Sequence, residues 1–179
     1  MDKKLYNGGT MEIEKKYKIK KIPENLNQYK KKEIEQGYLN TKDPVLRIRK
    51  SNDNYILTYK SRLGMTENPE DVALTCEEVE MPLSKESYEH LKEKVDQDMI
   101  SKTRYLIPLV DDLVAELDVF HGNLEGLVFV EVEFKDEEEA TRFCAPDWFG
   151  EDVTFYHRYK NNYLASLSSL EEFIQDSNN

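Results

Sequence analysis

The chain has 179 residues, of which 39% are hydrophobic and 34% are charged, and this suits one domain with its own core. A formal net charge of −11 argues against a nucleic-acid binder and against a protein of anionic membranes, because such proteins usually carry positive fields. The sequence shows no signal peptide and no long apolar run. Its two cysteines, Cys76 and Cys144, lack the spacing of a metal site, so we expect a reduced, soluble, cytoplasmic protein.

The two ends of the chain are expected to lie outside the domain. Residues 1–10 include Gly8-Gly9 and show no periodic pattern, which predicts a disordered leader or an added remnant. One domain should then span residues 11–175, with residues 176–179 as a tail. No internal repeat and no domain boundary is evident within residues 11–175.

Eight segments are predicted to be β-strands, because apolar and polar residues alternate over short runs bounded by turn residues. They are residues 12–16, 33–40, 45–50, 55–60, 72–81, 101–107, 113–120 and 127–134. In most of them one set of alternate residues is charged, and the side chains of a strand point alternately to its two faces. In the last strand, for example, three valines and Phe134 share one face while Glu131 and Glu133 lie on the other.

Three helices are predicted as well. Ser84 is a plausible N-cap for a helix whose apolar residues keep helical spacing as far as Met99. Asp136 should cap a short acidic helix that ends near Cys144. In residues 161–174 apolar side chains recur at roughly helical spacing, which predicts an amphipathic helix docked on the body of the protein.

An eight-stranded antiparallel meander can close into a barrel, which removes the sheet edges and encloses a lumen. The expected fold class is therefore α+β and mainly β, a closed eight-stranded antiparallel barrel with flanking helices. Residues 22–32 fit a short helix or a loop, and residues 61–71 form a polar loop long enough to be mobile over a cavity mouth. The charges expected to line the lumen are the bases Lys16, Arg47, Arg49, Lys60, Lys102 and Arg104 and the acids Glu12, Glu14, Glu78, Glu80, Glu116, Asp118, Glu131 and Glu133.

A solvated strand face is the ordinary explanation for any single pair of such charges. The pattern recurs along the chain, however, and polar residues at core-period positions are patterning errors unless function keeps them. Unpaired charges inside a barrel would cost on the order of several kcal/mol each, so they need mutual pairing, water, metal or ligand. Acids in such a cavity suit divalent cations, and bases suit phosphates.

The segment Glu12-Ile13-Glu14-Lys15-Lys16 matches the ExExK signature of the CYTH, or triphosphate tunnel metalloenzyme, superfamily, and the chain resembles that family from about Met11 to Ala165. The other matching segments, in order, are Gln36-Gly37-Tyr38-Leu39, Arg47-Ile48-Arg49, Thr58-Tyr59-Lys60, Glu78-Val79-Glu80, Lys102-Thr103-Arg104, Leu117-Asp118-Val119-Phe120, Glu131-Val132-Glu133-Phe134 and Tyr159-Lys160-Asn161. The resemblance implies an eight-stranded antiparallel tunnel with flanking helices. Members of the family hydrolyse triphosphate compounds, including inorganic triphosphate and thiamine triphosphate, and some form cyclic AMP from ATP.

The resemblance also implies roles for individual residues. The expected ligands of magnesium or manganese are Glu12, Glu14, Glu131 and Glu133. The expected triphosphate-binding bases are Lys16, Arg47, Arg49, Lys60 and Arg104. Lys102 is expected to activate or orient the attacking water, with Tyr38 as a helper. The residues expected either to bind a second metal or to orient the bases through salt bridges are Glu78, Glu80, Glu116 and Asp118.

We therefore expect a metal-dependent triphosphatase, with inorganic triphosphate as the leading substrate and Mg²⁺ or Mn²⁺ as the cofactor. No Ser, Cys or His sits in a constellation for covalent catalysis, and His121 and His157 are expected in loops. The alternatives are an adenylate cyclase of the same fold, a thiamine triphosphatase, and a non-catalytic binder of polyphosphate or nucleotides. The sequence does not distinguish one metal ion from two, and it leaves a homodimer open.

Overall fold

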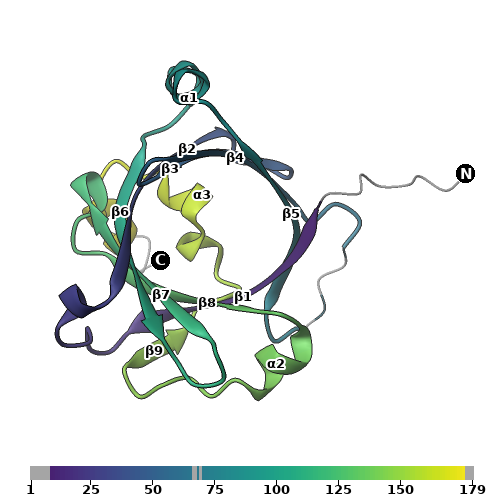
Figure 1. Ribbon diagram of the computed structural model, residues 1–179, viewed down its shortest axis with the longest axis vertical. Coiled ribbons are helices and arrows are strands. Elements are labelled where there is room, and N and C mark those ends of the chain that lie inside the picture. Colours follow the sequence, from purple (N-terminus) through teal and green to yellow (C-terminus); the bar gives the residue numbers. More distant parts are fainter. Residues whose placement is uncertain (1–8, 66–67, 69, 176–179) are drawn as a thin grey trace, which may run out of the picture.

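Eight antiparallel strands close into a barrel in the computed structural model, which describes residues 9–65, 68 and 70–175 (Figure 1). They are β1 (Thr10–Ile19), β2 (Lys30–Asn40), β3 (Val45–Ser51), β4 (Asn54–Ser61), β5 (Leu74–Pro82), β6 (Ile100–Pro108), β7 (Val114–His121) and β8 (Val128–Phe134). Their order around the ring is β5-β4-β3-β2-β6-β7-β8-β1, and pairing of β1 with β5 completes it. The predicted closed barrel of eight antiparallel strands is thereby confirmed. Its expected meander order is wrong, because β2 pairs with β6 instead of β1, and β5 pairs with β1 instead of β6.

A further short strand, β9 (Phe149–Asp152), was not predicted. It pairs with the C-terminal part of β1, with Tyr17 opposite Asp152 and Ile19 opposite Phe149. Four residues are too few to show the alternation by which a strand is recognised. Phe149 is nevertheless fully buried, and its ring packs on that of Tyr17 with 5.1 Å between centroids.

The helices are short. They are α1 (Lys85–Lys92), α2 (Glu137–Arg142), α3 (Asn161–Leu164) and α4 (Leu170–Gln175), with 3₁₀ turns η1 (Leu26–Gln28), η2 (Gly122–Leu124) and η3 (His157–Tyr159). Asp136 caps α2 as predicted, because its carboxylate accepts a hydrogen bond from the Glu139 backbone N–H at 2.8 Å. In the described part of the chain the longest helix, α1, has eight residues, and no helix there could span a membrane.

Several predicted boundaries fall at or beyond the limits of the described residues. Thr10, expected in the leader, belongs to β1. Residues 1–8 and 176–179, which make up most of the two expected end segments, lie outside the described residues, as does part of the loop predicted over residues 61–71. The segment 22–32, left open between helix and loop, contains the single turn η1.

The first predicted helix is shorter than expected. Ser84 does cap it, by accepting a hydrogen bond from the Ser87 backbone N–H at 3.0 Å, but α1 ends at Lys92 and the extension to Met99 is wrong. The chain has to leave the helix in order to enter β6. Met99 and Val95 then pack over Gly37, where an added Cβ would lie 2.9 Å from Val95 Cγ1. Their apolar spacing therefore reflects burial outside a helix.

The predicted tail helix is interrupted between α3 and α4. The connecting segment is rich in serine, whose side chains compete with the helix by bonding to nearby backbone groups. Ser169 Oγ accepts a hydrogen bond from the Glu172 backbone N–H at 3.4 Å, and the Glu172 carboxylate accepts one from the Ser168 N–H at 2.8 Å. These two bonds cap the start of a new helix. As a result Ile174, expected to dock, is 53% exposed, and Phe173 is buried.

Two apolar clusters hold the barrel from its two sides. The outer cluster lies under α2 and β9 and contains Ile13, Tyr17, Leu117, Val130, Val132, Phe134 and Phe149. The other lies between the barrel and the C-terminal segment, which runs from η3 to α4 (residues 157–175). It contains Tyr38, Phe120, Phe129, Tyr159, Leu164 and Phe173. Phe120 and Phe129 share strand faces with Asp118 and Glu131, so aromatic rings fill part of the lumen. The C-terminal segment, with α3 inside the outline of the ring, lies across this end of the barrel (Figure 1).

Gly37→Ala should lower the free energy of unfolding by about 1–3 kcal/mol, because the added methyl group would overpack the contact with Val95 and Met99. Urea unfolding measures this loss. Met99→Ala vacates the space, so the double variant should lose less than the two single variants together. Strictly additive losses would show that Met99 does not close over Gly37.

Candidate active site

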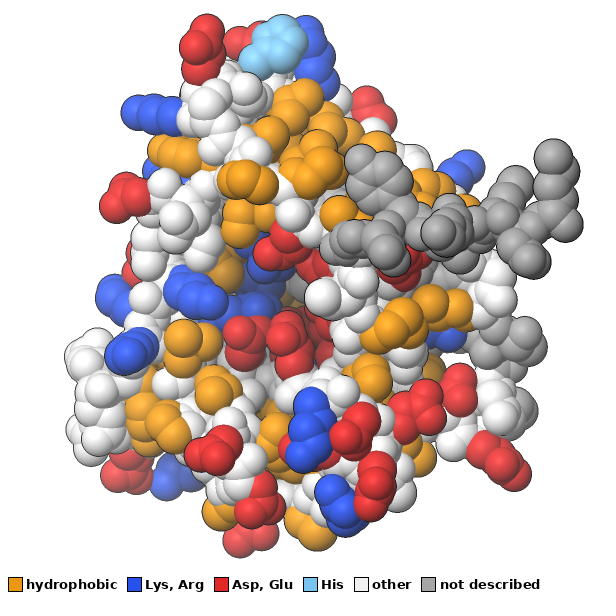
Figure 2. Space-filling view, turned by 45° about the vertical axis from the view of Figure 1, so that its right-hand side comes forward, with side chains coloured by type: hydrophobic (Ala, Val, Ile, Leu, Met, Phe, Trp, Pro, Cys, Tyr) orange, Lys and Arg blue, Asp and Glu red, His pale blue; other side chains and the backbone are white. Residues whose placement is uncertain are grey.

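A cavity of about 910 Å³ occupies the rest of the barrel lumen. Its basic lining residues are Lys16, Lys42, Arg47, Arg49, Lys60, Arg62, Arg104 and Lys160, and its acidic ones are Glu12, Glu14, Asp43, Glu78, Glu80, Glu131 and Glu133. Figure 2 shows a hollow in the surface with Lys and Arg side chains on one side of it and Asp and Glu side chains on the other. Side chains of both charges therefore line one cavity, and several of them form ion pairs with one another.

Most of the residues predicted for the site line this cavity. Those that do are Tyr38, Lys16, Arg47, Arg49, Lys60, Arg104, Glu12, Glu14, Glu131, Glu133, Glu78 and Glu80. Lys102, Glu116 and Asp118 face the lumen but are not part of the lining. Lys102 and Asp118 are buried behind it, whereas Glu116 is partly exposed. The structure thus gathers the predicted bases and acids and sets Lys102 one layer deeper.

Asp118 is the centre of a buried salt-bridge network. Its carboxylate accepts from Lys102 Nζ at 2.5 Å and from Arg104 Nε and Nη2, both at 2.6 Å. Arg104 also donates to Glu131 at 2.6 Å and to Glu116. Burial alone would raise the pKa of Asp118, but the two cations lower it. The network therefore fixes Arg104 at the cavity wall in one orientation.

Glu131 joins this network to the C-terminal segment. One of its oxygens lies 2.7 Å from Lys16 Nζ, and the other accepts from Arg104. Lys16 Nζ also donates to the Tyr159 carbonyl at 2.8 Å. Although burial opposes it, these cations hold the pKa of Glu131 well below its usual range. Both oxygens of Glu131 are thus occupied by bases.

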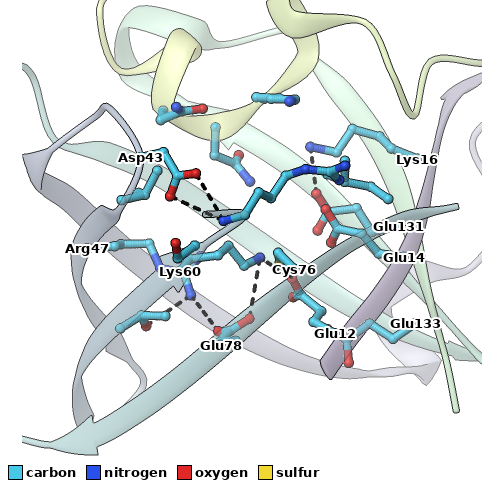
Figure 3. A pocket seen from close by; sticks show the side chains of 18 of the residues that line it. Glu12, Glu14, Lys16, Asp43, Arg47, Lys60, Cys76, Glu78, Glu131 and Glu133 are labelled. Carbon is cyan, nitrogen blue, oxygen red and sulfur yellow. Dashed lines mark hydrogen bonds and ion pairs between the residues drawn. The ribbon is translucent and has the colours of Figure 1, made fainter. Parts of the chain in front are cut away.

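A second group of ion pairs lies on β3, β4, β5 and β1 (Figure 3). Lys60 contacts Glu12 and lies 3.4 Å from Glu78. Arg47 Nη2 lies 3.1 Å from Thr58 Oγ1 and 3.4 Å from the Glu78 carboxylate. Burial would lower the pKa of Lys60, but the surrounding carboxylates raise it above its usual value. Lys60 therefore stays charged at any physiological pH.

Arg49 differs from the other bases of the site. Among the described residues no carboxylate forms an ion pair with it, and its half-buried side chain has an Nε without any hydrogen-bond partner. Burial, followed by the charges of Arg47 and Arg104, lowers its pKa to about 10. A guanidinium that is held among other cations without a counter-ion is a ready site for an anion.

On the acidic side of the cavity, carboxylates lie close together without cations to pair with. Glu14 lies directly opposite Glu133 on the neighbouring strand, and like charges in such a pair repel. Burial and then Glu12 raise the pKa of Glu14. Burial and then Glu116, Glu12 and Glu14 raise the pKa of Glu133 to about 7. No cation among the described residues pairs with Glu14 or Glu133.

Glu12, Glu14 and Glu133, here called the acid cluster, fit a divalent cation in charge and in donor type. Carboxylate oxygens are the ligands that hard divalent cations prefer, and such a cation would offset the repulsion within the cluster. Within the described part of the chain, however, no three acidic, His or Cys side chains already surround a common point. The cluster therefore suits an ion that keeps other ligands of its own, such as water or phosphate oxygens.

The two residues predicted to act on water lie at different depths. Tyr38 lines the cavity, and its hydroxyl accepts a hydrogen bond from Gln36 Nε2 at 2.9 Å. Lys102 has no exposed surface, and its amine lies 5.3 Å from the centroid of the Phe120 ring. Burial lowers the pKa of Lys102 to about 8, despite the opposing effect of Asp118. Its assignment as the base stays a prediction.

The two histidines are not in plain loops as expected. His121 ends β7, and its Nε2 lies 2.8 Å from Thr103 Oγ1. His157 belongs to η3 and lines the cavity.

Sequence reasoning also missed several cavity residues. Cys76 faces the lumen and donates to Glu12 at 3.1 Å; its alternation with Glu78 on β5 could have placed it there. Lys42 and Arg62 lie in loops, where no periodicity signals direction.

Known proteins resemble this chain in sequence and in structure. A CYTH domain family model matches residues 10–162. This chain belongs to the CYTH domain family. An inorganic triphosphatase of Nitrosomonas europaea is 38% identical to it over 156 residues, which cover 86% of this chain and 96% of the relative. An inorganic triphosphatase of Acetivibrio thermocellus is 35% identical over 130 residues, covering 72% and 77%.

Solved structures with this CYTH fold agree. A crystal structure of an inorganic triphosphatase matches with a TM-score of 0.63 and 34% identity, covering 91% of this chain and 99% of that one. A putative adenylyl cyclase from Hippeastrum, described as having a dominant triphosphatase activity, matches with a TM-score of 0.52 over 73% of this chain and 82% of that one. At 17% identity, the second likeness shows the fold alone.

Glu133→Gln should raise the thermal midpoint near pH 8 in the presence of a chelator. The pKa of Glu133 is about 7 in the folded protein, above its ordinary value of 4.5, so the folded state holds this proton more tightly than the unfolded state. The contribution of Glu133 to the stability of the fold is fully present below about pH 4.5 and is lost as the pH rises through 7. Burial contributes to the raised pKa, but part of the Glu133 side chain still reaches solvent, which screens the repulsion, so the shift should be modest.

Scanning calorimetry near pH 5 and near pH 8 makes this comparison. The variant should match the wild type at the lower pH and exceed it at the higher one. An equal difference at both values would contradict the charge-repulsion account.

Proposed function

We propose that this CYTH protein hydrolyses inorganic triphosphate in its barrel cavity with the help of a divalent cation, Mg²⁺ or Mn²⁺. The single observation that carries the proposal is Arg49, a half-buried guanidinium that has no counter-ion and shares a cavity with the acid cluster. A polyanion would pair with Arg49, and a divalent cation bound with it would pair with the acid cluster. The curated relatives named as inorganic triphosphatases support the same activity.

The bases of the cavity would bind the phosphate oxygens. Arg47 and Arg49 are on β3, Lys60 is on β4 and Arg104 is on β6, so four cations approach from three strands. Guanidinium groups can hold phosphate oxygens in bidentate fashion. Because phosphoryl transfer depends mainly on charge neutralisation and in-line positioning, this arrangement accounts for catalysis without a covalent step.

The ion pairs of the cavity would preorganise these bases. Asp118 holds Arg104 from behind, and Glu78 holds Arg47 and Lys60 from the side. Groups that are already in place need little reorganisation when substrate charge develops. We therefore assign Glu78, Glu116 and Asp118 to orienting the bases. Glu131, expected as a metal ligand, is bonded to Lys16 and Arg104 and would serve the same purpose.

The acid cluster would hold the metal ion. CYTH triphosphatases generally depend on a metal ion, and Glu12, Glu14 and Glu133 supply oxygens of the right kind. When bound, a divalent cation neutralises phosphate charge and polarises the phosphoryl oxygens. Magnesium usually binds to one or two carboxylates plus substrate phosphates, which agrees with a cluster that is not arranged as a closed shell.

Lys102 would take the proton of the attacking water, with Tyr38 as its partner at the cavity wall. The lowered pKa of Lys102 makes its neutral amine available at mildly alkaline pH. Because Lys102 lies behind the lining, its amine has to leave Asp118, or the proton has to pass through a lining group such as Tyr38. The Gln36 amide already orients the Tyr38 hydroxyl.

A phosphate-release panel tests the proposed function. Orthophosphate and cyclic AMP would be measured with inorganic triphosphate, pyrophosphate, ATP, thiamine triphosphate and p-nitrophenyl phosphate, each with Mg²⁺, Mn²⁺ or chelator. Triphosphate should be cleaved fastest, because the bases span several phosphates. Cleavage should occur only with metal, because the acid cluster would hold a divalent cation. Cyclic AMP from ATP without phosphate release from triphosphate, or faster cleavage of the monoester, would refute the proposal.

Glu14→Gln should lower triphosphate turnover at limiting metal by about 100-fold or more, since it removes a hard anionic ligand while keeping side-chain size. Glu89→Gln, on the exposed face of α1, is the matched control and should keep wild-type turnover. Equal rates in both variants would remove Glu14 from the site.

Lys102→Arg should lose most of the turnover, on the order of 100-fold, with little change in KM, because arginine keeps the charge but cannot deprotonate. In the wild type, turnover should rise with pH through about 8, where the folded-state pKa of Lys102 lies. Initial rates from about pH 6 to pH 10 measure both effects. Near-normal turnover with an unchanged pH profile would leave Lys102 as a positioning residue.

A further inference from the structure

Three bases of the lumen each stand opposite a carboxylate on a neighbouring strand. Side chains that face one another across a strand pair are close enough to interact, and in these three pairs the base and the acid lie within ion-pair distance. The pairs are Lys16 with Glu131 at 2.7 Å, Lys60 with Glu78 at 3.4 Å and Arg104 with Asp118 at 2.6 Å. For these bases the protein itself supplies the counter-charge.

Arg49 is placed differently, because both of its cross-strand neighbours are uncharged. It stands opposite Gln36 on β2 and opposite Ile56 on β4. Directly opposite side chains have Cβ atoms about 4.5–5.5 Å apart, so a carboxylate in place of the Gln36 amide could reach the guanidinium. Burial and the neighbouring cations lower the pKa of Arg49 to about 10, and the opposing effect of Asp118 does not reverse this. Gln36 therefore occupies a position from which an acidic residue would neutralise Arg49.

The Gln36 side chain is fully buried and lies behind the cavity lining, to which Tyr38 and Arg49 belong. Its Nε2 donates to the Tyr38 hydroxyl at 2.9 Å, so the hydroxyl proton of Tyr38 is left for another acceptor. Among the described residues, Gln36 Oε1 and Arg49 Nε both lack a hydrogen-bond partner. Because a buried polar atom without a partner lowers stability, this amide suits a role at the site better than a role in packing.

We propose that Gln36 is a positioning residue whose neutral amide leaves the charge of Arg49 to the phosphate oxygens and holds the Tyr38 hydroxyl beside it. The proposal rests on the proposed triphosphatase function, since Gln36 would act through two members of that site. A carboxylate at the same position would become the counter-ion of Arg49 and compete with the substrate. It would also accept the Tyr38 proton, which the amide leaves available.

Titration calorimetry with inorganic triphosphate in chelator tests the charge argument without turnover. Gln36→Glu adds a charge at nearly constant size, so the Kd should rise on the order of tenfold or more. Gln36→Met is uncharged and of similar size, so its Kd should stay within about threefold of the wild-type value. Gln28→Glu adds the same charge on the exposed turn η1, away from the cavity, and as the matched control it should bind like the wild type.

Two further variants show whether Gln36 acts through its neighbours. In an Arg49→Met background, Gln36→Glu should cost much less affinity, because a buried carboxyl without a counter-ion stays protonated. Gln36→Met should lower kcat on the order of tenfold with little change in KM, because Tyr38 loses the donor that orients its hydroxyl. In a Tyr38→Phe background the same change should lower kcat much less.

Equal losses of affinity in Gln36→Glu and Gln36→Met, or wild-type affinity in Gln36→Glu, would overturn the proposal, because binding would not depend on charge at this position. Undiminished effects in the Arg49→Met and Tyr38→Phe backgrounds would overturn it as well. The two kinds of measurement separate this proposal from the proposed function. If the wild type releases no phosphate from triphosphate, the triphosphatase is refuted, whereas a charge-dependent loss of triphosphate binding in chelator still supports the role of Gln36.

Discussion

The pairing of β1 with β5 is the contact on which the candidate site depends. It places Glu12 opposite Cys76 and Glu14 opposite Leu74, and so joins the two ends of the eight-stranded sheet. Without it the lumen face would be open to water, which screens charges strongly. With it, alternate residues of eight strands share one enclosed space, where each charge needs a partner or a ligand. The lowered pKa of Lys102 and the raised pKa of Lys60 are both products of this enclosure.

The charges of the lumen fall into two classes with different purposes. Asp118, Glu131 and Glu78 are bonded to bases and make a rigid frame, which accounts for buried cations that would otherwise be costly. Arg49 and the pair of Glu14 and Glu133 lack such partners among the described residues. The protein therefore tolerates unfavourable electrostatics at the places where a polyanion and a cation would relieve it, as expected of a functional site.

Much of this arrangement could be predicted from the sequence, because strand alternation alone assigns side chains to a face. The eight strands and the lumen-facing position of Arg49 and Glu133 follow from that rule, whereas the order of the strands around the ring does not. Depth along the barrel does not follow from it. Lys102 and Arg104 are two residues apart on one face, yet aromatic rings and the C-terminal segment cover Lys102 while Arg104 reaches the cavity.

Helix ends and loops were predicted less well for related reasons. The spacing of Val95 and Met99 records burial against β2 and is indistinguishable from helical spacing. The serines that divide the tail helix act through local capping, which a pattern of apolar residues does not reveal. Lys42 and Arg62 line the cavity from loops that are held by hydrogen bonds to Asp43 and Thr41, and such bonds leave no trace in residue periodicity.

The alternating register of the barrel also limits how this protein can vary in length. Inserting or deleting one residue within a strand would turn every later lumen side chain of that strand to the outer face, and carry apolar residues into the cavity. Changes of length are therefore confined to the hairpin connections, whose backbone is not part of the ladder. The β2–β3 and β4–β5 connections are such places and also line the cavity. They are where a change in substrate range could arise without disturbing the phosphate-binding strands.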